Sequence, residues 1–329
     1  MSVGAYAVSS DTGRKRRRNE DSYVIAPPLF AVADGMGGAQ AGEIASRLAA
    51  GALEETDLGA GSGEERVTSL IQEANRRVYE RSNEDPSASG MGTTITVALV
   101  GDTGVTIGHV GDSRAYRYRD GSIEQITEDH SLVNELMKSG KLSREEAETH
   151  PQRSVITRAL GTDPDVDADT FTIEAKSGDV FLLCSDGLTD MVGEREIFEL
   201  VELNRLDIDA ALKSLVRAAN RSGGEDNITV VAFEIAESVA LTHDGETREN
   251  VLLPPPARDE EDTLTEMDAV PAVDTAVVST AEIQAELEAK DRQDRAKRRR
   301  RLRRRIVAWL AVIAIAAGIA LVLYLRFLR

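Results

Sequence analysis

Acidic residues that are followed by glycine recur along the sequence, and the first of them ends an apolar stretch. Residues 29–33 lack polar side chains and predict a buried strand, after which come Asp34, Gly35 and two further glycines. Glycine lets the backbone approach whatever the Asp34 carboxylate binds, so the Gly35 carbonyl could be a second ligand of a hard metal ion. The alternative is a strand-to-helix turn in which Asp34 caps a helix that begins near Ala39.

Three further acids occupy similar positions. Asp186 follows the apolar run 180–184, and Asp226 comes just before the last predicted strand, 228–235. Asp112 lies in a glycine-containing link between two predicted strands, and taken alone it is equally consistent with an ordinary turn residue. Because the end of one strand and the start of its antiparallel neighbour can share a sheet edge, these acids could lie close together.

A basic loop near the N-terminus leads into two more acids. Residues 14–18 are all Arg or Lys, including Arg16, and Glu20 and Asp21 follow shortly afterwards. This pattern fits a solvent-exposed, charged loop. It also fits an arginine that contacts a phosphate beside carboxylates that support a metal ion.

Carboxylates that converge require cations, because their mutual repulsion would otherwise force several of them to be neutral. Ligation by oxygen alone, with no His or Cys at metal-binding spacing, predicts magnesium or manganese rather than zinc. Two such ions about 3.5 to 4 Å apart can share one water, lower its pKa and place it in line with a phosphorus atom. The predicted reaction is therefore hydrolysis of a phosphoester.

Periodic apolar patterns predict the elements that hold these residues. Strands are expected over residues 3–8, 23–26, 29–33, 180–184 and 228–235, and helices over 39–55, 64–82, 194–202 and 208–220. Four short β-branched or aromatic runs between residues 93 and 126 predict one antiparallel meander. Residues 130–161 mix charges with helix breakers and predict a surface flap. Within it, His130 and His150 are candidate bases, although a histidine in a polar loop more often has only a hydrogen-bonding role.

Composition divides the chain into four parts. Residues 1–236 carry the periodic elements and predict the folded domain, whereas residues 237–280 are acidic, include three consecutive prolines and predict a disordered linker. Residues 281–305 predict a charged, basic juxtamembrane helix. Residues 306–325 carry no charge and would span about 30 Å as a helix, which predicts a transmembrane helix. A buried core helix is the alternative for this last segment.

Charge and cysteine content restrict partners and location. The formal net charge is −18, and because residues 297–329 carry only basic charges, the body of the protein is more acidic still. An acidic body argues against nucleic acid as the main partner. The basic run before residue 306 predicts a cell-membrane protein whose folded domain is cytoplasmic, with contact to anionic membrane lipid. The single cysteine, Cys184, fits a reducing compartment.

Six short motifs in order carry a family resemblance. They are Gly-x-x-Arg-x-x-Asn-Glu-Asp (13–21), Val-Ala-Asp-Gly-Met-Gly-Gly (32–38), Met-Gly-Thr-Thr (91–94), Gly-Asp-Ser-Arg (111–114), Cys-Ser-Asp-Gly-Leu (184–188) and Asp-Asn-Ile-Thr (226–229). Together they resemble the metal-dependent protein phosphatases of type 2C in their bacterial form, over about residues 1–236. The resemblance implies an α+β fold, a four-layer α-β-β-α sandwich of two antiparallel sheets flanked by helices.

The resemblance also implies roles for the acids. Asp34 would bridge two divalent ions, Mn²⁺ or Mg²⁺, and the Gly35 carbonyl would complete one shell. Asp186 and Asp226 would hold the other ion, and Asp112 with Asp186 would form a weaker third site.

In the same way, the family pattern implies roles for the N-terminal loop and leaves one role unassigned. Glu20 and Asp21 would anchor metal-bound waters, and Arg16 would bind the substrate phosphate. Eukaryotic members have a histidine where this chain has Met36, so no general acid is assigned.

Taken together, these observations predict a membrane-tethered, cytoplasm-facing protein phosphatase that acts on phosphoserine and phosphothreonine. Its expected partners are phosphorylated proteins, including membrane-associated serine/threonine kinases and their substrates. A catalytically silent domain that binds phosphoproteins, or an anchored scaffold, is the alternative outside enzymes. A small-molecule phosphatase would share the metal chemistry and differ in substrate size.

Overall fold

The computed structural model describes residues 1–37, 41–102, 104–237 and 276–277. The chain divides into two compact units, 1–277 and 278–329, and all the described residues belong to the first. The basic helix predicted at 281–305 and the transmembrane helix predicted at 306–325 lie outside the described residues, as does most of the predicted linker. Among the helices that the structure describes, none has the length and apolar character needed to cross a membrane.

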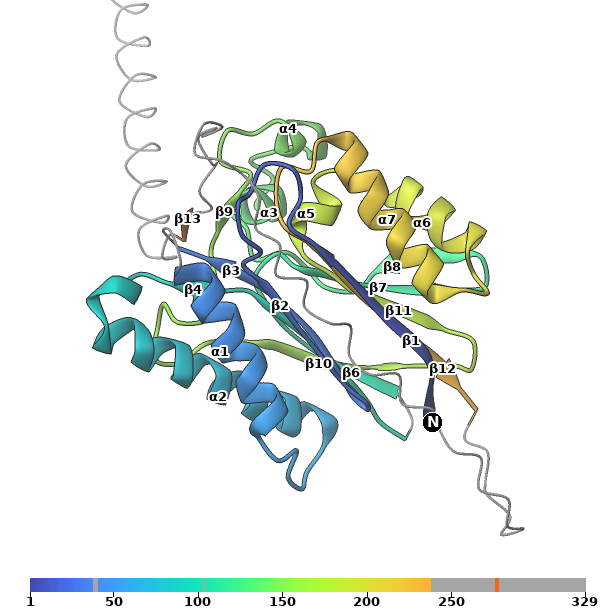
Figure 1. Cartoon of the computed structure of the whole chain (residues 1–329), viewed down its shortest axis with the longest axis horizontal. Coiled ribbons are helices and arrows are strands. Elements are labelled where there is room, and N and C mark those ends of the chain that lie inside the picture. The colour runs from blue at the N-terminus through green and yellow to red at the C-terminus, as the bar shows by residue number, and fades with distance from the viewer. Residues whose placement is uncertain (38–40, 103, 238–275, 278–329) are drawn as a thin grey trace, which may run out of the picture. The chain divides into compact units, whose positions relative to one another are not determined.

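Two antiparallel sheets form the centre of the folded unit (Figure 1). The first sheet has the order β1 (Ser2–Asp11), β12 (Ile228–Ala236), β11 (Val180–Cys184), β7 (Arg114–Arg119) and β8 (Ser122–Gln125). The second has the order β10 (Asp169–Glu174), β6 (Gly104–Val110), β5 (Ile95–Val100), β3 (Leu29–Met36) and β2 (Asp21–Ala26), and the short β4 (Gly92–Thr93) pairs with the end of β3.

Helices cover the outer face of each sheet, which completes the expected α-β-β-α sandwich. The helices α1 (Ala41–Glu55) and α2 (Gly63–Glu84) lie on the second sheet, and α6 (Glu194–Leu203) and α7 (Ile208–Ser222) lie on the first. Ser62 and Glu65 form a capping box that satisfies backbone donors at the start of α2. The fold predicted for residues 1–236 is therefore confirmed.

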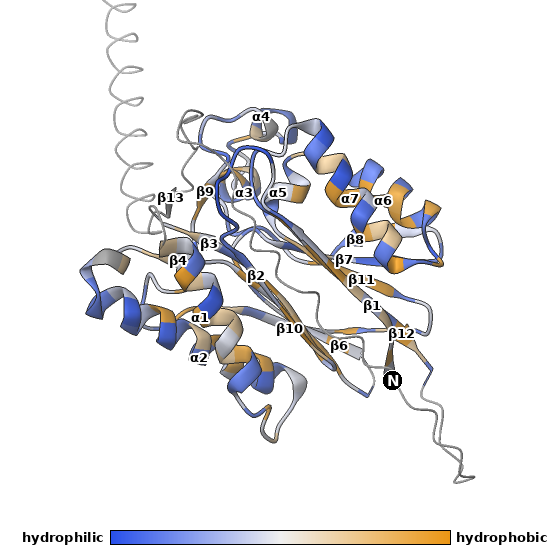
Figure 2. Cartoon of the chain, viewed as in Figure 1, coloured by the Kyte–Doolittle hydropathy of each residue, from blue (hydrophilic) through white to orange (hydrophobic). Residues whose placement is uncertain are grey.

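Hydrophobic side chains fill three layers, one between the sheets and one under each pair of helices. Phe30, Phe181 and Phe233 stack between the sheets, with ring centroids 4.2 Å and 5.3 Å from that of Phe233. Alternate residues of β3 serve different layers, because Phe30 points between the sheets while Ala31 and Ala33 pack under the helices. Figure 2 shows the hydrophobic residues concentrated along the strands.

Two expectations about the strands are wrong. The strand predicted to end before Asp34 continues to Met36, because Gly35 and Met36 pair with Thr93 and Gly92 of β4. The predicted meander is divided between the sheets, since β5 and β6 lie in the second sheet while β7 and β8 lie in the first. The link that contains Asp112 therefore crosses from one sheet to the other. The strand β10 and the one-turn helix α5 (Asp186–Thr189) were not expected.

The flap contains the short helices α3 (Leu132–Lys138) and α4 (Arg144–Glu148) and the two-residue strand β9 (Val155–Ile156), and a 3₁₀ turn (Pro86–Ala88) precedes β4. Ile156 and Ala159 pack against Met36, so the flap rests on the end of β3. The strand β13 (Ala276–Val277) pairs in parallel with β9. These two residues fall in the segment predicted to be a disordered linker, and the structure differs from that prediction there.

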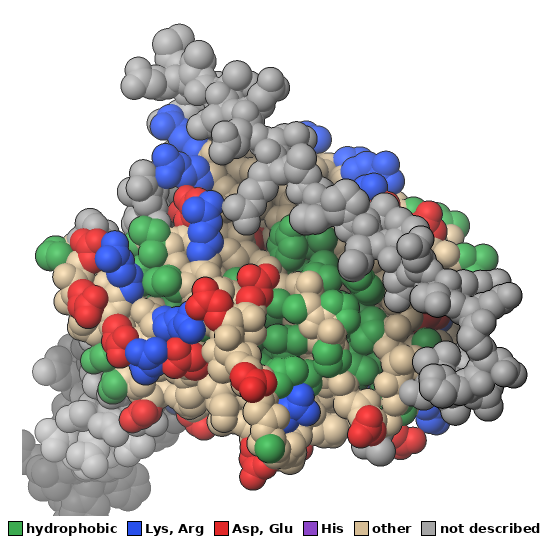
Figure 3. Space-filling view, turned by 60° about the horizontal axis from the view of Figure 1, so that its bottom comes forward, with side chains coloured by type: hydrophobic (Ala, Val, Ile, Leu, Met, Phe, Trp, Pro, Cys, Tyr) green, Lys and Arg blue, Asp and Glu red, His purple; other side chains and the backbone are tan. Residues whose placement is uncertain are grey.

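The strands β1 and β2 form the open edges of the two sheets on one side of the sandwich. Tyr6 on β1 and Tyr23 on β2 are 45% and 37% exposed, although the Tyr6 ring also lies 5.9 Å from the buried ring of Phe30. Figure 3 shows hydrophobic side chains gathered on this side of the molecule, bordered by charged ones.

Candidate functional site

The strands of the second sheet place two aspartates side by side. Asp34 on β3 and Asp21 on β2 are paired residues of neighbouring strands, where like charges repel each other. Two threonines fix the backbone of Asp34. Its N–H donates to Thr94 Oγ1 at 3.0 Å, and its carbonyl accepts from Thr93 Oγ1 at 2.7 Å and from the Thr94 N–H at 2.9 Å.

The first sheet supplies Asp186, where β11 passes into α5, and Asp226, just before β12. Ser185 joins the two sheets, because its hydroxyl donates to Asp21 Oδ2 at 2.8 Å and accepts from the Thr229 N–H at 3.0 Å. The chain turns tightly at this point. A Cβ atom on Gly187 would lie 2.0 Å from the carbonyl oxygen of Asn227, so α5 can sit directly on the start of β12 only because this residue is glycine.

The basic loop is held over the same end of the sandwich by Asn227. Its Oδ1 accepts from the Glu20 N–H at 2.7 Å, and its Nδ2 donates to the carbonyls of Thr12 and Arg18 at 2.9 and 2.8 Å. Arg16 NH2 donates to Asp226 Oδ2 at 2.8 Å. The guanidinium therefore lies beside the acids, and its predicted contact with a phosphate stays a prediction.

Glu20 and Gly35 lie where the second sheet meets α1. Glu20 Oε2 would be 2.6 Å from a Cβ atom on Gly42, which places this carboxylate over the first turn of the helix. A Cβ atom on Gly35 would lie 2.1 Å from the Gly42 carbonyl oxygen, and the Gly35 N–H donates to the Glu20 carbonyl at 3.2 Å. Gly35 therefore allows the end of β3 to pack closely on α1, and the role of its carbonyl as a metal ligand stays a prediction.

Asp112 reaches the group from the link between β6 and β7. Thr94 supports this link as well as Asp34, because Thr94 Oγ1 lies 2.8 Å from Ser113 Oγ. The structure thus brings Asp21, Asp34, Asp112, Asp186 and Asp226 to one end of the sandwich. The sequence motifs contain Ser185, Thr94 and Asn227, but no role was expected for them, because hydrogen bonds between sheets leave no periodic signal.

Burial and mutual repulsion perturb these carboxyl groups. Burial raises the pKa of Asp34 well above its ordinary value, and the charges of Asp21 and Asp186 raise it further. The pKa of Asp186 is likewise raised well above its usual range by burial and by Asp112 and Asp226. Burial raises the pKa of Asp21 to about 6 and that of Asp112 to about 7. A bound cation would relieve this repulsion and keep the carboxylates ionised.

The donor set fits divalent cations. Asp21, Asp112 and Asp186 each have a buried Oδ1 atom without a hydrogen-bond partner, which is costly for an acceptor that nothing else satisfies. All the candidate ligands are oxygen atoms, as Mg²⁺ and Mn²⁺ prefer. Within the described ranges, no three His, Cys, Asp or Glu side chains are already arranged around one point as a formed metal centre. Asp226 instead directs its oxygens at Arg16 and at the Asn227 N–H.

The two candidate histidine bases lie in different settings. His130 uses both ring nitrogens, because Nδ1 accepts from the Gly111 N–H at 3.1 Å and Nε2 lies 3.2 Å from Asp169 Oδ2. Among the residues that the structure describes, the ring of His150 has one hydrogen bond, which it accepts from the nearby Gln152 N–H at 3.2 Å. Neither contact is to one of the five aspartates. Met36 is buried under the flap, where it packs against Ile156 and Ala159.

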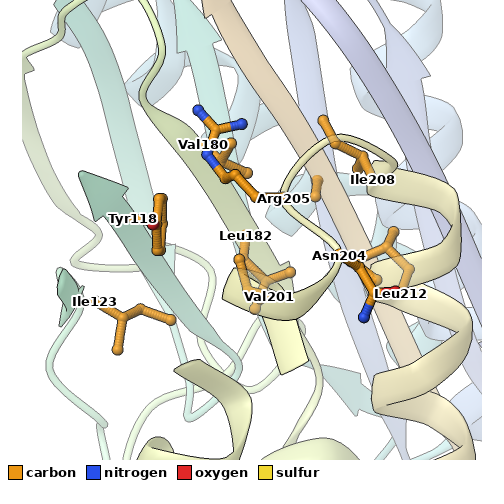
Figure 4. Close-up of a pocket in the computed structure, with 11 residues that line it drawn as sticks. Tyr118, Ile123, Val180, Leu182, Val201, Asn204, Arg205, Ile208 and Leu212 are labelled. Carbon is orange, nitrogen blue, oxygen red and sulfur yellow. The ribbon is translucent and has the colours of Figure 1, made fainter. Parts of the chain in front are cut away.

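A pocket elsewhere in the fold is apolar and does not contain these acids. It lies between the outer face of the first sheet and the helices α6 and α7, and Val180, Leu182, Val201 and Leu212 are among its lining residues (Figure 4). Arg205 also lines the pocket and lies over the Tyr118 ring, 5.4 Å from the centroid. The pocket is a small gap left where these helices pack on the sheet.

Comparison with known proteins gives one family. A family model described as protein phosphatase 2C matches residues 15–228. The serine/threonine phosphatase Stp of Listeria monocytogenes serotype 4b is 41% identical over 236 residues, which cover 68% of this chain and 93% of that protein. The serine/threonine protein phosphatase PstP of Mycobacterium tuberculosis is 39% identical over 70% of this chain and 45% of its own.

Solved structures agree with the sequence comparison. The crystal structure of Mycobacterium tuberculosis PstP has a TM-score of 0.68, with 39% identity over 71% of this chain and 100% of that one. The catalytic domain of a serine/threonine protein phosphatase PstP in complex with two manganese ions has a TM-score of 0.66, with 36% identity over 72% and 100% of the two chains. The match over residues 15–228 and these relatives show that the chain is a serine/threonine phosphatase and belongs to the protein phosphatase 2C family.

Proposed function

We propose that this enzyme hydrolyses phosphoserine and phosphothreonine in proteins at the end of the sandwich where the five aspartates meet. One observation carries the proposal. Acids from both sheets converge there, and three of them keep a buried oxygen without a partner. Two divalent ions, Mn²⁺ or Mg²⁺, would acidify a shared water and align it with the phosphorus atom. The manganese ions in the related catalytic domain support this choice of cofactor.

Each residue then has a definite task. Asp34 would hold both ions, and the Gly35 carbonyl would complete the shell of one of them. Asp186 and Asp226 would hold the other ion, and Asp112 with Asp186 would form a weaker third site. Thr93 and Thr94 keep Asp34 in place through its backbone.

Residues of the N-terminal loop would orient water and substrate. Glu20 and Asp21 would accept hydrogen bonds from waters around the ions, and Ser185 orients the Asp21 carboxylate. Arg16 would exchange its contact with Asp226 for the substrate phosphate, which a guanidinium can bind through two parallel hydrogen bonds. Asn227 keeps this loop over the acids.

The test measures phosphate release from a phosphothreonine peptide by the full chain in detergent, with and without Mn²⁺. We expect Asp34→Asn to fold but to lose at least about a hundredfold in rate, because the bridging ligand is removed. Asp209→Asn is the matched control, since Asp209 is exposed on α7, away from the five aspartates, and its carboxylate pairs with Lys213. A wild-type protein that binds the peptide without releasing phosphate would support the scaffold alternative. An Asp34→Asn variant that kept most of its rate would refute the bridging role.

We also propose that residues 306–325 tether the enzyme to the cell membrane with the catalytic domain in the cytoplasm. The uncharged twenty-residue segment and the basic run before it support this arrangement. Phosphorylated proteins at the membrane, including serine/threonine kinases and their substrates, would then be the partners. Fractionation of cells that express the full chain, or the chain ended at residue 305, tests the tether. Recovery of both in the same fraction would refute it.

A further inference from the structure

His130 clamps the residue that precedes Asp112. Its N–H donates to the Gly111 carbonyl at 2.7 Å, and its Nδ1 accepts from the Gly111 N–H at 3.1 Å. Gly111 is confined on the other side too, because a Cβ atom there would lie 2.6 Å from Thr94 Cβ. The peptide that leads into Asp112 is therefore held between Thr94 and His130, and it can shift only if one of them moves.

The hydrogen bonds determine the tautomer of His130. A backbone amide can only donate, so Nδ1 carries no proton and Nε2 carries it. Nε2–H then donates to Asp169 Oδ2 at 3.2 Å. Arg158 NH1 lies 3.1 Å from Nε2, but it donates instead to Asp169 Oδ1 at 2.9 Å and to the Asp167 carbonyl at 2.8 Å. Burial lowers the pKa of His130, and the nearby Arg158 lowers it further, which keeps the ring neutral. With both nitrogens engaged, the ring has no free lone pair for a substrate.

The same residue is joined to the flap. The carbonyl of His130 accepts from the Thr157 N–H at 2.8 Å, directly after β9, and the neighbouring Ser131 forms a β-bridge with Ile156. Three segments therefore meet at His130. They are the link that carries Asp112, the start of β10 with Asp169, and the flap strand with the residues that follow it.

We propose that His130 is a positioning residue that fixes Asp112 and couples its position to that of the flap. This inference rests on the proposed function, in which Asp112 contributes to a weaker third metal site. Loss of the Nδ1 acceptor leaves the bond from the His130 N–H to the Gly111 carbonyl as the one hydrogen bond from His130 to Gly111, so the residue before Asp112 is held less firmly. The affinity of the third site should then fall, while the sites of Asp34, Asp186 and Asp226 keep their supports.

Two substitutions distinguish the contact made by Nδ1 from the contact made by Nε2. His130→Asn places an oxygen acceptor where Nδ1 lies and removes the contact with Asp169, whereas His130→Gln reaches toward Asp169 and leaves the Gly111 N–H without its acceptor. His150→Ala is the matched control, because it removes a flap histidine whose ring accepts a local hydrogen bond from the Gln152 N–H. All are made in the full chain.

The first measurement is hydrogen–deuterium exchange at the Gly111 amide of the metal-free protein. We expect about tenfold faster exchange in His130→Gln, which corresponds to the loss of one hydrogen bond, and wild-type exchange in His130→Asn and His150→Ala. The second is the Mn²⁺ concentration that gives half-maximal phosphate release from a phosphothreonine peptide. It should rise at least about fivefold in His130→Gln only.

Unchanged exchange at Gly111 in His130→Gln, or the same increase in both His130 variants, would overturn the inference. So would faster exchange in His130→Gln with an unchanged Mn²⁺ requirement. A wild-type protein without metal-dependent phosphate release would refute the proposed function instead. The exchange experiment needs neither metal nor activity, so it still decides whether His130 positions Gly111.

Discussion

Replacement of Gly187 by alanine should disturb the close packing of α5 on the start of β12 at the acidic end of the sandwich. The added Cβ atom would lie 2.0 Å from the Asn227 carbonyl oxygen, so one of the two segments must move by roughly 1.4 Å to restore ordinary contact at 3.4 Å. Asp186 precedes Gly187 and Asp226 precedes Asn227, so this displacement separates these two acids. Metal ligands tolerate errors of only about 0.2 Å, and a misplacement of 1 Å can cost about a hundredfold in rate.

The cost in stability should be much smaller than the cost in activity. Overpacking of this kind typically destabilises by about 1 to 3 kcal/mol, which lowers the melting temperature of a domain this size by about 2 to 12 °C. The expected result is a folded protein at 25 °C whose Mn²⁺-dependent rate on a phosphothreonine peptide falls at least about a hundredfold.

The control for this experiment is Gly193→Ala. Gly193 precedes α6, and a Cβ atom there would have no neighbour within 4 Å, so both its rate and its melting temperature should stay near wild type. A Gly187→Ala enzyme with more than a third of the wild-type rate would refute the argument that close packing of α5 on β12 positions Asp186. Equal losses in both variants would refute it as well.

Two further predictions concern stability. Burial, with a smaller contribution from His130, lowers the pKa of His109 to about 4, whereas the pKa in the unfolded chain is near 6.5. The unfolded chain therefore protonates this histidine first on acidification, and the contribution of His109 to stability should fall by about 2 kcal/mol between pH 7.5 and pH 5. The raised pKa values of Asp21 and Asp112 act in the opposite direction, so the effect is read against His109→Asn, whose melting temperature should be higher relative to wild type at pH 5 than at pH 7.5. Ser185→Ala removes the donor to Asp21 and leaves the Thr229 N–H without its side-chain partner, so calorimetry should show a loss of about 2 kcal/mol, or roughly 4 to 8 °C. An unchanged pH profile or an unchanged melting temperature, respectively, would contradict these predictions.

The sequence could predict which acids lie close together, because the direction of a strand determines the end of the sheet at which an acid beside it lies. Asp34 comes near the end of one buried strand and Asp186 at the end of another, and Asp226 precedes a neighbour of the second strand that runs the opposite way. The strand 180–184 was predicted with its observed bounds, since a short uninterrupted apolar run between polar residues is typical of a buried strand.

Other features leave no such signal. Periodicity reports that a segment is a strand but not which sheet it joins, so the four strands between residues 93 and 126 could not be divided correctly. The roles of Asn227 and Ser185 depend on hydrogen bonds between residues far apart in the chain. His130 illustrates the same limit, because its partner Asp169 begins a strand that the apolar pattern did not predict.

Because β1 pairs with β12, the enzyme is expected to be inactive while it is being synthesised. The first strand of the domain finds its partner only when residues 228–236 have been made, and Asn227 is needed to hold the loop that carries Arg16. At about 5 to 20 residues per second, this last strand follows the first by roughly ten to fifty seconds. A nascent chain therefore exposes its early acids without a completed site, and we expect phosphatase activity to emerge as a single late step.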